Sequence, residues 1–230
     1  MSRFNDFHSA YVLHTRKYRD TSLLVELFSK EDGRYSLVAR GARGNKSKFN
    51  LQLFSPLMVS SFGKGELKTA SVIESNGLGY HLSGKNLFIG LYVNELLFRV
   101  LGKFDPFENL FDRYDELLGM LQLDSFDTSA LRLFEISLLA DLGYGISFDI
   151  ESSTGDAIVP DKFYCYVVED GFRHLVSGND NSKAIEGRHL LAISQGMIDL
   201  DGDRILRNIV RKSIDQLLGG KALNSRKLFA

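Results

Sequence analysis

The sequence predicts an α+β protein, with an N-terminal five-stranded β-barrel of the OB type followed by an α-helical bundle with a small β-hairpin insert. Short apolar runs between Gly-containing turns fill residues 8–75, and apolar residues recur at helical spacing from residue 86. An alternating segment then interrupts the helices. We therefore expect a barrel domain over 1–80 and a helical domain over 81–230, in which 145–181 is the insert.

Five short apolar runs make up the predicted barrel. The turns between them include Asp-Gly at 32–33 and Gly-Lys-Gly at 63–65, which are typical of hairpins because Gly accepts positive φ angles. Five strands in about 70 residues fit a small closed barrel, and a split sandwich is the alternative. The runs are YVLH (11–14), SLLVELFS (22–29), YSLVAR (35–40), LMVSSF (57–62) and LKTASVIE (67–74).

Amphipathic helices are predicted from residue 86 onward. Asp105 and Pro106 are typical of a helix start, and Asp127 or Thr128 is the expected cap of the next helix. The segment FYCYVVEDGFRHLV, 163–176, alternates around Asp170-Gly171 and predicts a hairpin. Two more helices are expected, one starting at Ser182 and one ending at 219–220. Asp112, Asp115 and Glu116 fit an exposed acidic helix face better than a catalytic carboxylate pair.

Composition excludes several classes of protein. The chain has 230 residues, 44% of them hydrophobic, which is enough for a substantial core. Cys165 is its single cysteine, so neither an intrachain disulfide nor a four-cysteine zinc site can form. No apolar run approaches the roughly 18 residues of a membrane span, and residues 1–14 lack the apolar core of a signal peptide. We expect a cytoplasmic protein.

Charge is strongly segregated behind a net charge of −1. Residues 1–80 hold 12 Lys and Arg against 7 Asp and Glu, and residues 204–230 hold 7 against 1. Residues 81–203 hold 9 against 21. Basic ends around an acidic middle indicate a surface that faces a polyanion.

Two basic segments of the barrel are the candidate nucleic-acid contacts. HTRKYR, 14–19, places cations around an aromatic ring, and the loop after the third strand adds more. That loop lacks the Gly-Lys-Ser/Thr spacing of a nucleotide-binding loop, and a merely solvated basic loop is the alternative. Both segments flank the usual binding face of such a barrel. The predicted contacts are Arg16, Lys17, Arg19, Arg40, Arg43, Lys46 and Lys48, with a second patch of Arg207, Arg211, Lys212, Arg226 and Lys227.

The sequence indicates no catalytic set, metal site or cofactor. Its five histidines are scattered, and there is no Gly-x-Ser-x-Gly turn. Arg132 lies at the edge of an apolar helix face that includes Leu131 and Phe134. By spacing alone it is either solvated or paired with a neighbouring acid, although it could also clamp an acidic peptide.

The chain resembles the RecO family of bacterial recombination mediators, in the style of its gammaproteobacterial members. The matching stretches run in the family's order over nearly the whole chain. They include YVLHTRKYRDTSLLVELFS, DGRYSLVARGAR, FSPLMVSSFGKGELKT, GLYVNELLFRVL, LRLFEISLLADLGYG and LLGGKALNSRKLF.

The resemblance implies a nucleoid-associated protein that binds and anneals single- and double-stranded DNA and is not an enzyme. With RecR it would help RecA replace the single-stranded DNA-binding protein. It also implies that Arg132 lies on the helix that receives the acidic, apolar tail of the single-stranded DNA-binding protein. Some members carry a four-cysteine zinc site in the insert, and Cys165 alone cannot supply one. The alternative is an adaptor whose basic loops dock an acidic protein.

Overall fold

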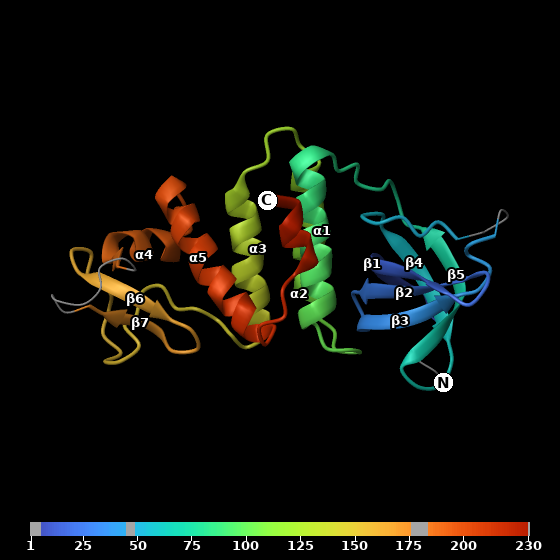
Figure 1. Ribbon diagram of the computed structural model, residues 1–230, viewed down its shortest axis with the longest axis horizontal. Coiled ribbons are helices and arrows are strands. Elements are labelled where there is room, and N and C mark those ends of the chain that lie inside the picture. The colour runs from blue at the N-terminus through green and yellow to red at the C-terminus, as the bar shows by residue number, and fades with distance from the viewer. Residues whose placement is uncertain (1–5, 45–48, 176–183, 230) are drawn as a thin grey trace. The chain divides into compact units, whose positions relative to one another are not determined.

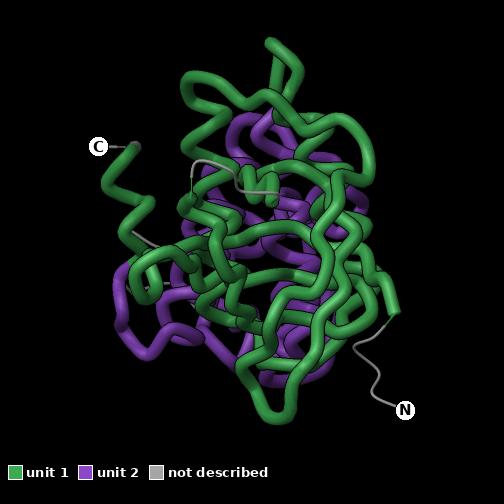
Figure 2. The backbone as a smooth tube through the Cα atoms, turned by 90° about the vertical axis from the view of Figure 1, so that its right-hand side faces the viewer, with its two compact units in different colours: residues 1–126, 223–230 green, residues 127–222 purple. Residues whose placement is uncertain are grey.

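The computed structural model describes residues 6–44, 49–175 and 184–229. It divides into two compact units, residues 1–126 with 223–230 and residues 127–222 (Figure 2). The first helices thus share a unit with the barrel, so this division differs from the boundary near residue 80 that the sequence pattern indicated.

A closed five-stranded barrel forms the N-terminal part of the first unit, as predicted (Figure 1). The strand order is β1-β2-β3-β5-β4, closed by pairing of β4 with β1. The β3–β5 pair is parallel and the other pairs are antiparallel. The strands are β1 (His8–Tyr18), β2 (Ser22–Ser29), β3 (Gly33–Ala39), β4 (Leu57–Phe62) and β5 (Leu67–Ser75).

Strand β1 is longer than the sequence pattern indicated. It pairs with β2 as far as Tyr18, so Arg16 and Lys17 belong to a strand and not to a loop. A register shift between Val12 and His14 leaves Leu13 as an extra residue, which is the geometry of a β-bulge. The bulge lets the apolar half of β1 face the core while its basic half continues into solvent.

Helices α1 (Gly84–Val100) and α2 (Glu108–Leu121) belong to the same unit as the barrel. The expected helix start at Asp105 and Pro106 is wrong, because α2 begins at Glu108. The preceding segment is held beside β3: Lys103 forms a bridge with Arg34, and Phe104, with a positive φ of 57°, donates its N–H to the Arg34 carbonyl at 2.9 Å. A side chain on Gly33 would collide with the Asp105 carbonyl, which fits glycine at this contact.

The buried amide of Asn94 connects three elements of the first unit. Its Nδ2 donates to the carbonyls of Val12 and Leu13, at 3.3 and 3.4 Å, beside the β-bulge. Its Oδ1 accepts from the Tyr114 hydroxyl at 2.6 Å. One side chain of α1 therefore holds strand β1 and helix α2.

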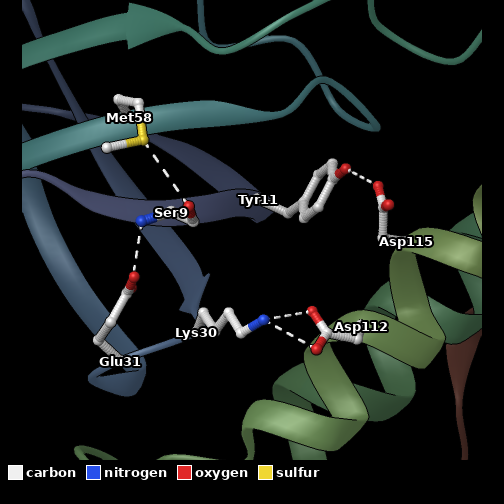
Figure 3. A network of polar contacts seen from close by, with 7 residues as sticks. All are labelled: Ser9, Tyr11, Lys30, Glu31, Met58, Asp112 and Asp115. Carbon is white, nitrogen blue, oxygen red and sulfur yellow. Dashed lines mark hydrogen bonds and ion pairs between the residues drawn. The ribbon is translucent and has the colours of Figure 1, made fainter.

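A second polar group of contacts joins α2 to the barrel (Figure 3). Lys30 donates to both carboxylate oxygens of Asp112, at 2.7 and 2.8 Å, and Tyr11 donates its hydroxyl to Asp115. Tyr80 donates to the same Asp115 oxygen at 2.8 Å. Burial and then the Asp115 carboxylate raise the pKa of Tyr11, so its hydroxyl remains a donor.

These contacts correct the expectation for the acidic face of α2. Asp112 and Glu116 are exposed, as expected, but Asp115 is half-buried. It serves as the shared acceptor of two tyrosines. Its role is therefore structural.

A 3₁₀ helix, η3 (Asn224–Phe229), returns the C-terminal segment to α1. The Glu95 carboxylate accepts from the backbone N–H groups of Asn224 and Ser225, at 3.0 and 2.7 Å. Burial of Glu95 opposes ionisation. Hydrogen bonding by Ser225, then by Asn224, and the charge of Arg99 outweigh burial and lower the pKa of Glu95.

The second unit combines helices with a small sheet of order β7-β6-β8. The predicted hairpin is confirmed as β6 (Phe163–Val167) and β7 (Gly171–His174). The expected helix start at Ser182 lies outside the described residues; α4 itself begins at Gly187, because β8 (Ile185–Glu186) pairs with β6. The helices are α3 (Thr128–Asp141), α4 (Gly187–Ser194) and α5 (Leu200–Leu217).

Side-chain caps start two helices of the second unit. Asp127 accepts from the Ser129 N–H at 2.9 Å, which confirms Asp127 as a helix cap. Asp199 accepts from the Gly202 N–H at 2.7 Å and so caps the start of α5. A common core of apolar residues from the sheet, α4 and α5 includes Tyr164, Phe172, Leu190 and Leu206.

Replacement of Asn94 by alanine should destabilise the first unit by about 3 kcal/mol, because Tyr114 and the Val12 carbonyl lose buried partners. Urea unfolding followed by circular dichroism measures this change. Asn208→Ala, at an exposed position of α5, should change stability by less than about 0.5 kcal/mol. Equal stabilities for the two variants would contradict the structural role of Asn94.

Docking of η3 should weaken in acid. The folded-state pKa of Glu95 lies below its ordinary value of 4.5, so the ionised carboxylate contributes stability above that pH. This contribution is lost as the pH falls through the lower folded pKa. Hydrogen exchange of segment 224–229, corrected for intrinsic rates, should show decreasing protection below pH 4.5.

Glu95→Gln tests the origin of that effect. In this variant, segment 224–229 should be weakly protected from hydrogen exchange at every pH. The Glu116→Gln variant, changed on the exposed face of α2, should behave as wild type. Full protection in Glu95→Gln would show that the carboxylate does not hold η3.

Candidate nucleic-acid interface

Strand register brings the two basic segments to one end of the barrel. Lys17 pairs with Leu23, and Leu23 pairs with Ala39, so the last residues of β1 and β3 flank the start of β2. Arg40 follows β3 directly. We call the five exposed cations here the basic end: Arg16, Lys17, Arg19, Arg40 and Arg43.

Arg43 fastens the two segments of the basic end to each other. Its guanidinium donates to the carbonyls of Arg19 and Asp20, at 3.3 and 3.0 Å. Its own N–H donates to the Thr21 carbonyl at 2.9 Å. Arg43 was predicted as a phosphate contact, and these bonds give it a positioning role for its cationic neighbours as well.

The turn between β1 and β2 presents Arg19 beside an aromatic ring. Arg19 adopts a positive φ of 51°, and its guanidinium lies 5.3 Å from the centroid of the Tyr18 ring. Asp20 is the single acid within 14–21 and 40–44, so the basic end has a net positive charge. Lys46 and Lys48, also predicted here, lie outside the described residues.

The outer face of β2 and β3, which OB barrels commonly use for nucleic acid, is occupied here. Phe28 packs against Phe111 of α2, with ring centroids 5.4 Å apart. Glu26 accepts from Arg34 at 3.1 Å and from Ser36 at 2.7 Å. Arg34 also donates to the Leu101 carbonyl, at 2.9 Å. This unit therefore leaves the basic end, and not the middle of that face, open to a ligand.

The predicted C-terminal patch is divided between the two units. Arg207, Arg211 and Lys212 are exposed on α5, where Arg211 lies 3.9 Å from Asp215. Arg226 and Lys227 belong to η3 in the other unit. A single patch of all five cations stays a prediction.

Arg132 is paired within its own unit. Its side chain is 12% exposed, and it forms ion pairs with Glu135 and with Asp203, the latter at 3.2 Å. Leu131 and Phe134 are buried, with 5% and 4% of their surface exposed. The pairing with a neighbouring acid that spacing indicated is confirmed, and a peptide carboxylate would have to compete for the guanidinium.

Sequence reasoning missed two polar residues that hold elements of the first unit together. Asn94 and Glu95 stand in the middle of an apolar helix, where a buried polar side chain requires a partner. That position was the available signal. The partners, in β1, α2 and η3, are distant in sequence and could not be identified from spacing.

The described part of the chain contains neither a metal-binding cluster nor a membrane-spanning helix. No group of three His, Cys, Asp or Glu residues among the described positions could hold a metal ion. None of the described helices combines the length and apolar character needed to cross a membrane.

Comparison with known proteins identifies the family. The model for "Recombination protein O N terminal" matches residues 2–77, and that for "Recombination protein O C terminal" matches 81–227. A "DNA repair protein RecO" of Methylococcus capsulatus is 41% identical over 223 residues, 96% of this chain and 91% of that protein. Those of Enterobacter sp. (strain 638) and Coxiella burnetii (strain CbuG_Q212) are 41% and 37% identical, over 96% and 95% of this chain and 94% and 95% of their own length. The chain therefore belongs to the RecO family of DNA repair and recombination proteins.

Proposed function

We propose that this RecO-family chain binds single- and double-stranded DNA through the basic end of its barrel and anneals complementary strands. The observation that carries this proposal is the exposure of five cations at one barrel end, with Asp20 as the single acid within segments 14–21 and 40–44. Cations spaced around an aromatic ring suit a nucleic-acid backbone. The Arg43 bonds keep the cations in place before DNA arrives, which lowers the entropy cost of binding.

Binding of this kind depends on phosphate neutralisation. The affinity should fall steeply with salt and vary little with sequence, because the contacts release counterions and read no base edges. Annealing requires a second strand to be held as well. The cations of α5, Arg207, Arg211 and Lys212, are the candidates, since they are exposed on one helix.

The proposed role in the cell is that of a mediator. Together with RecR, the chain would help RecA replace the single-stranded DNA-binding protein on DNA, without enzymatic turnover of its own. Family membership supports this assignment. The competing function, an adaptor that docks an acidic protein through the basic end, predicts no DNA binding by the isolated chain.

Arg132 is the proposed clamp for the tail of the single-stranded DNA-binding protein. A tail carboxylate would displace Asp203, the more exposed of the two partners, at 25% against 2% for Glu135. The exchange replaces one ion pair by another, so most of the affinity must come from apolar contacts nearby.

The DNA contacts can be tested by the salt dependence of binding to a labelled single-stranded oligonucleotide. Replacing both Arg16 and Arg40 by alanine should weaken binding and reduce the slope of log K against log salt by about 1.4, or about 0.7 per lost phosphate contact. Fluorescence anisotropy across a salt series measures both quantities. Circular dichroism checks that the fold is retained.

The matched control removes two exposed cations outside the basic end, Lys64 and Lys85. The Lys64→Ala/Lys85→Ala variant should keep the wild-type slope. A wild-type slope in the Arg16→Ala/Arg40→Ala variant instead would reject the basic end as the DNA contact and favour the adaptor.

The Arg132 clamp can be tested with two opposite substitutions. Arg132→Ala should weaken binding of an acidic, apolar tail peptide about tenfold, the worth of one charge-assisted bond. Asp203→Asn should strengthen it, because the guanidinium then has one competitor fewer. Isothermal titration calorimetry measures both, with DNA binding as the control that neither variant changes. Peptide affinities that both equal wild type would eliminate the clamp.

A further inference from the structure

A hollow of about 360 Å³ in the first unit lies between β1, α1 and the start of η3. Its apolar lining includes Leu13, Leu91 and Phe98, and its polar lining includes His14, Arg99 and Ser225. The described contacts give this hollow no structural role. Its size and mixed lining are those of a small-ligand site.

The aromatic groups of the hollow provide a stacking surface. The rings of His14 and Phe98 have centroids 5.9 Å apart and an interplanar angle of 34°. His14 is exposed and Phe98 is half-buried, so a planar ligand can reach them from solvent. A nucleobase has two flat π-faces, so any of the four bases can stack on such side chains.

The polar groups inside the hollow are engaged within the protein. Asn94 is bound to β1 and Tyr114, and Glu95 is bound to η3. The Ser225 hydroxyl is buried, and its interaction with Glu95 helps to lower the pKa of that carboxyl. These groups therefore hold the walls of the hollow in place, and the stacking surface supplies the contact with a base.

Strand β1 runs from the hollow, at His14, to the basic end, at Arg16. His14 and Arg16 pair with Glu26 and Leu24 and so share the outer side of the strand. Residues two apart on one strand are separated by about 6.5 Å. A strand of DNA whose phosphate meets Arg16 would therefore carry its neighbouring base past His14. Arg99, 33% exposed, adds a second cation at the rim.

We propose that this hollow receives one unpaired nucleobase of the single strand whose phosphates contact the basic end. The proposal rests on the function proposed above and adds a site for the base. A base inside a duplex is paired and stacked and cannot enter. The hollow therefore distinguishes single-stranded from double-stranded DNA without reading sequence.

The test compares a labelled oligothymidylate with an abasic oligonucleotide of the same length. Wild type should bind the thymidylate about tenfold more tightly, within the range of stacking on one aromatic surface. His14→Ala should lose most of this preference through weaker thymidylate binding alone. Its salt slope should equal that of wild type, because no phosphate contact is removed.

Two further variants complete the design. His81→Ala, at an exposed histidine outside the hollow, should keep the full preference. Leu91→Trp, which fills the hollow from α1, should abolish it while the salt slope persists. This second variant tests occupancy independently of His14.

The outcomes separate the two proposals. Equal, salt-dependent binding of both oligonucleotides by wild type would overturn the base site and leave the backbone contacts standing. A thymidylate preference that survives both His14→Ala and Leu91→Trp would also overturn it. Absence of salt-dependent binding to either oligonucleotide would overturn the DNA function itself.

Discussion

The first unit depends on the burial of one side-chain amide within an apolar helix. Asn94 is 2% exposed, and burying an amide without partners costs several kcal/mol. The cost is offset because its oxygen and nitrogen meet partners on α2 and at the bulge of β1. An apolar residue could fill the space but could not donate to the Val12 and Leu13 carbonyls beside the bulge. The barrel and its two helices are therefore held in one arrangement.

This arrangement decides which part of the barrel can meet a ligand. The outer face of β2 and β3 is used for packing on α2, through Phe28, and for the Glu26–Arg34 pair. The cations of the basic end lie outside this packing. They are exposed to solvent at the end of the barrel where β1 and β3 end. The bulge at Leu13 contributes as well, because it shifts the register so that His14 and Arg16 share the outer side. Packing and proposed binding thus occupy successive segments of the same strand.

The contribution of each polar contact to the stability of this unit depends on how deeply the contact is buried. The Lys30–Asp112 pair is exposed and worth little by itself. The Tyr11 and Tyr80 hydroxyls meet Asp115 in a part-buried position, where an unpaired carboxylate would be costly. Glu95 combines the two situations, since it is partly accessible and holds the backbone of η3. The edge of the proposed base site is therefore formed by a segment whose docking depends on one carboxylate.

Local patterns in the sequence determined the barrel strands, the β6–β7 hairpin and the presence of the main helices. Short apolar runs between glycine turns predicted the barrel strands, the Asp127 cap was readable from the sequence, and the basic segments stood out by charge. The helix expected at Asp105 and Pro106 begins later, because bonding to β3 prevails over local propensity. Likewise, β8 takes residues that local pattern assigned to a helix.

Tertiary structure decided what no local pattern contains: the partners of Asn94, Glu95 and Asp115, the ion pair of Arg132 with Asp203, and the hollow beside His14. The hydrogen bonds of Asn94 and Glu95, for example, join residues separated by 20 and by 130 positions. Spacing along a chain carries information only about neighbours on the same helix or strand. Which distant groups meet is determined by how whole elements pack, and so are the surfaces that packing leaves exposed.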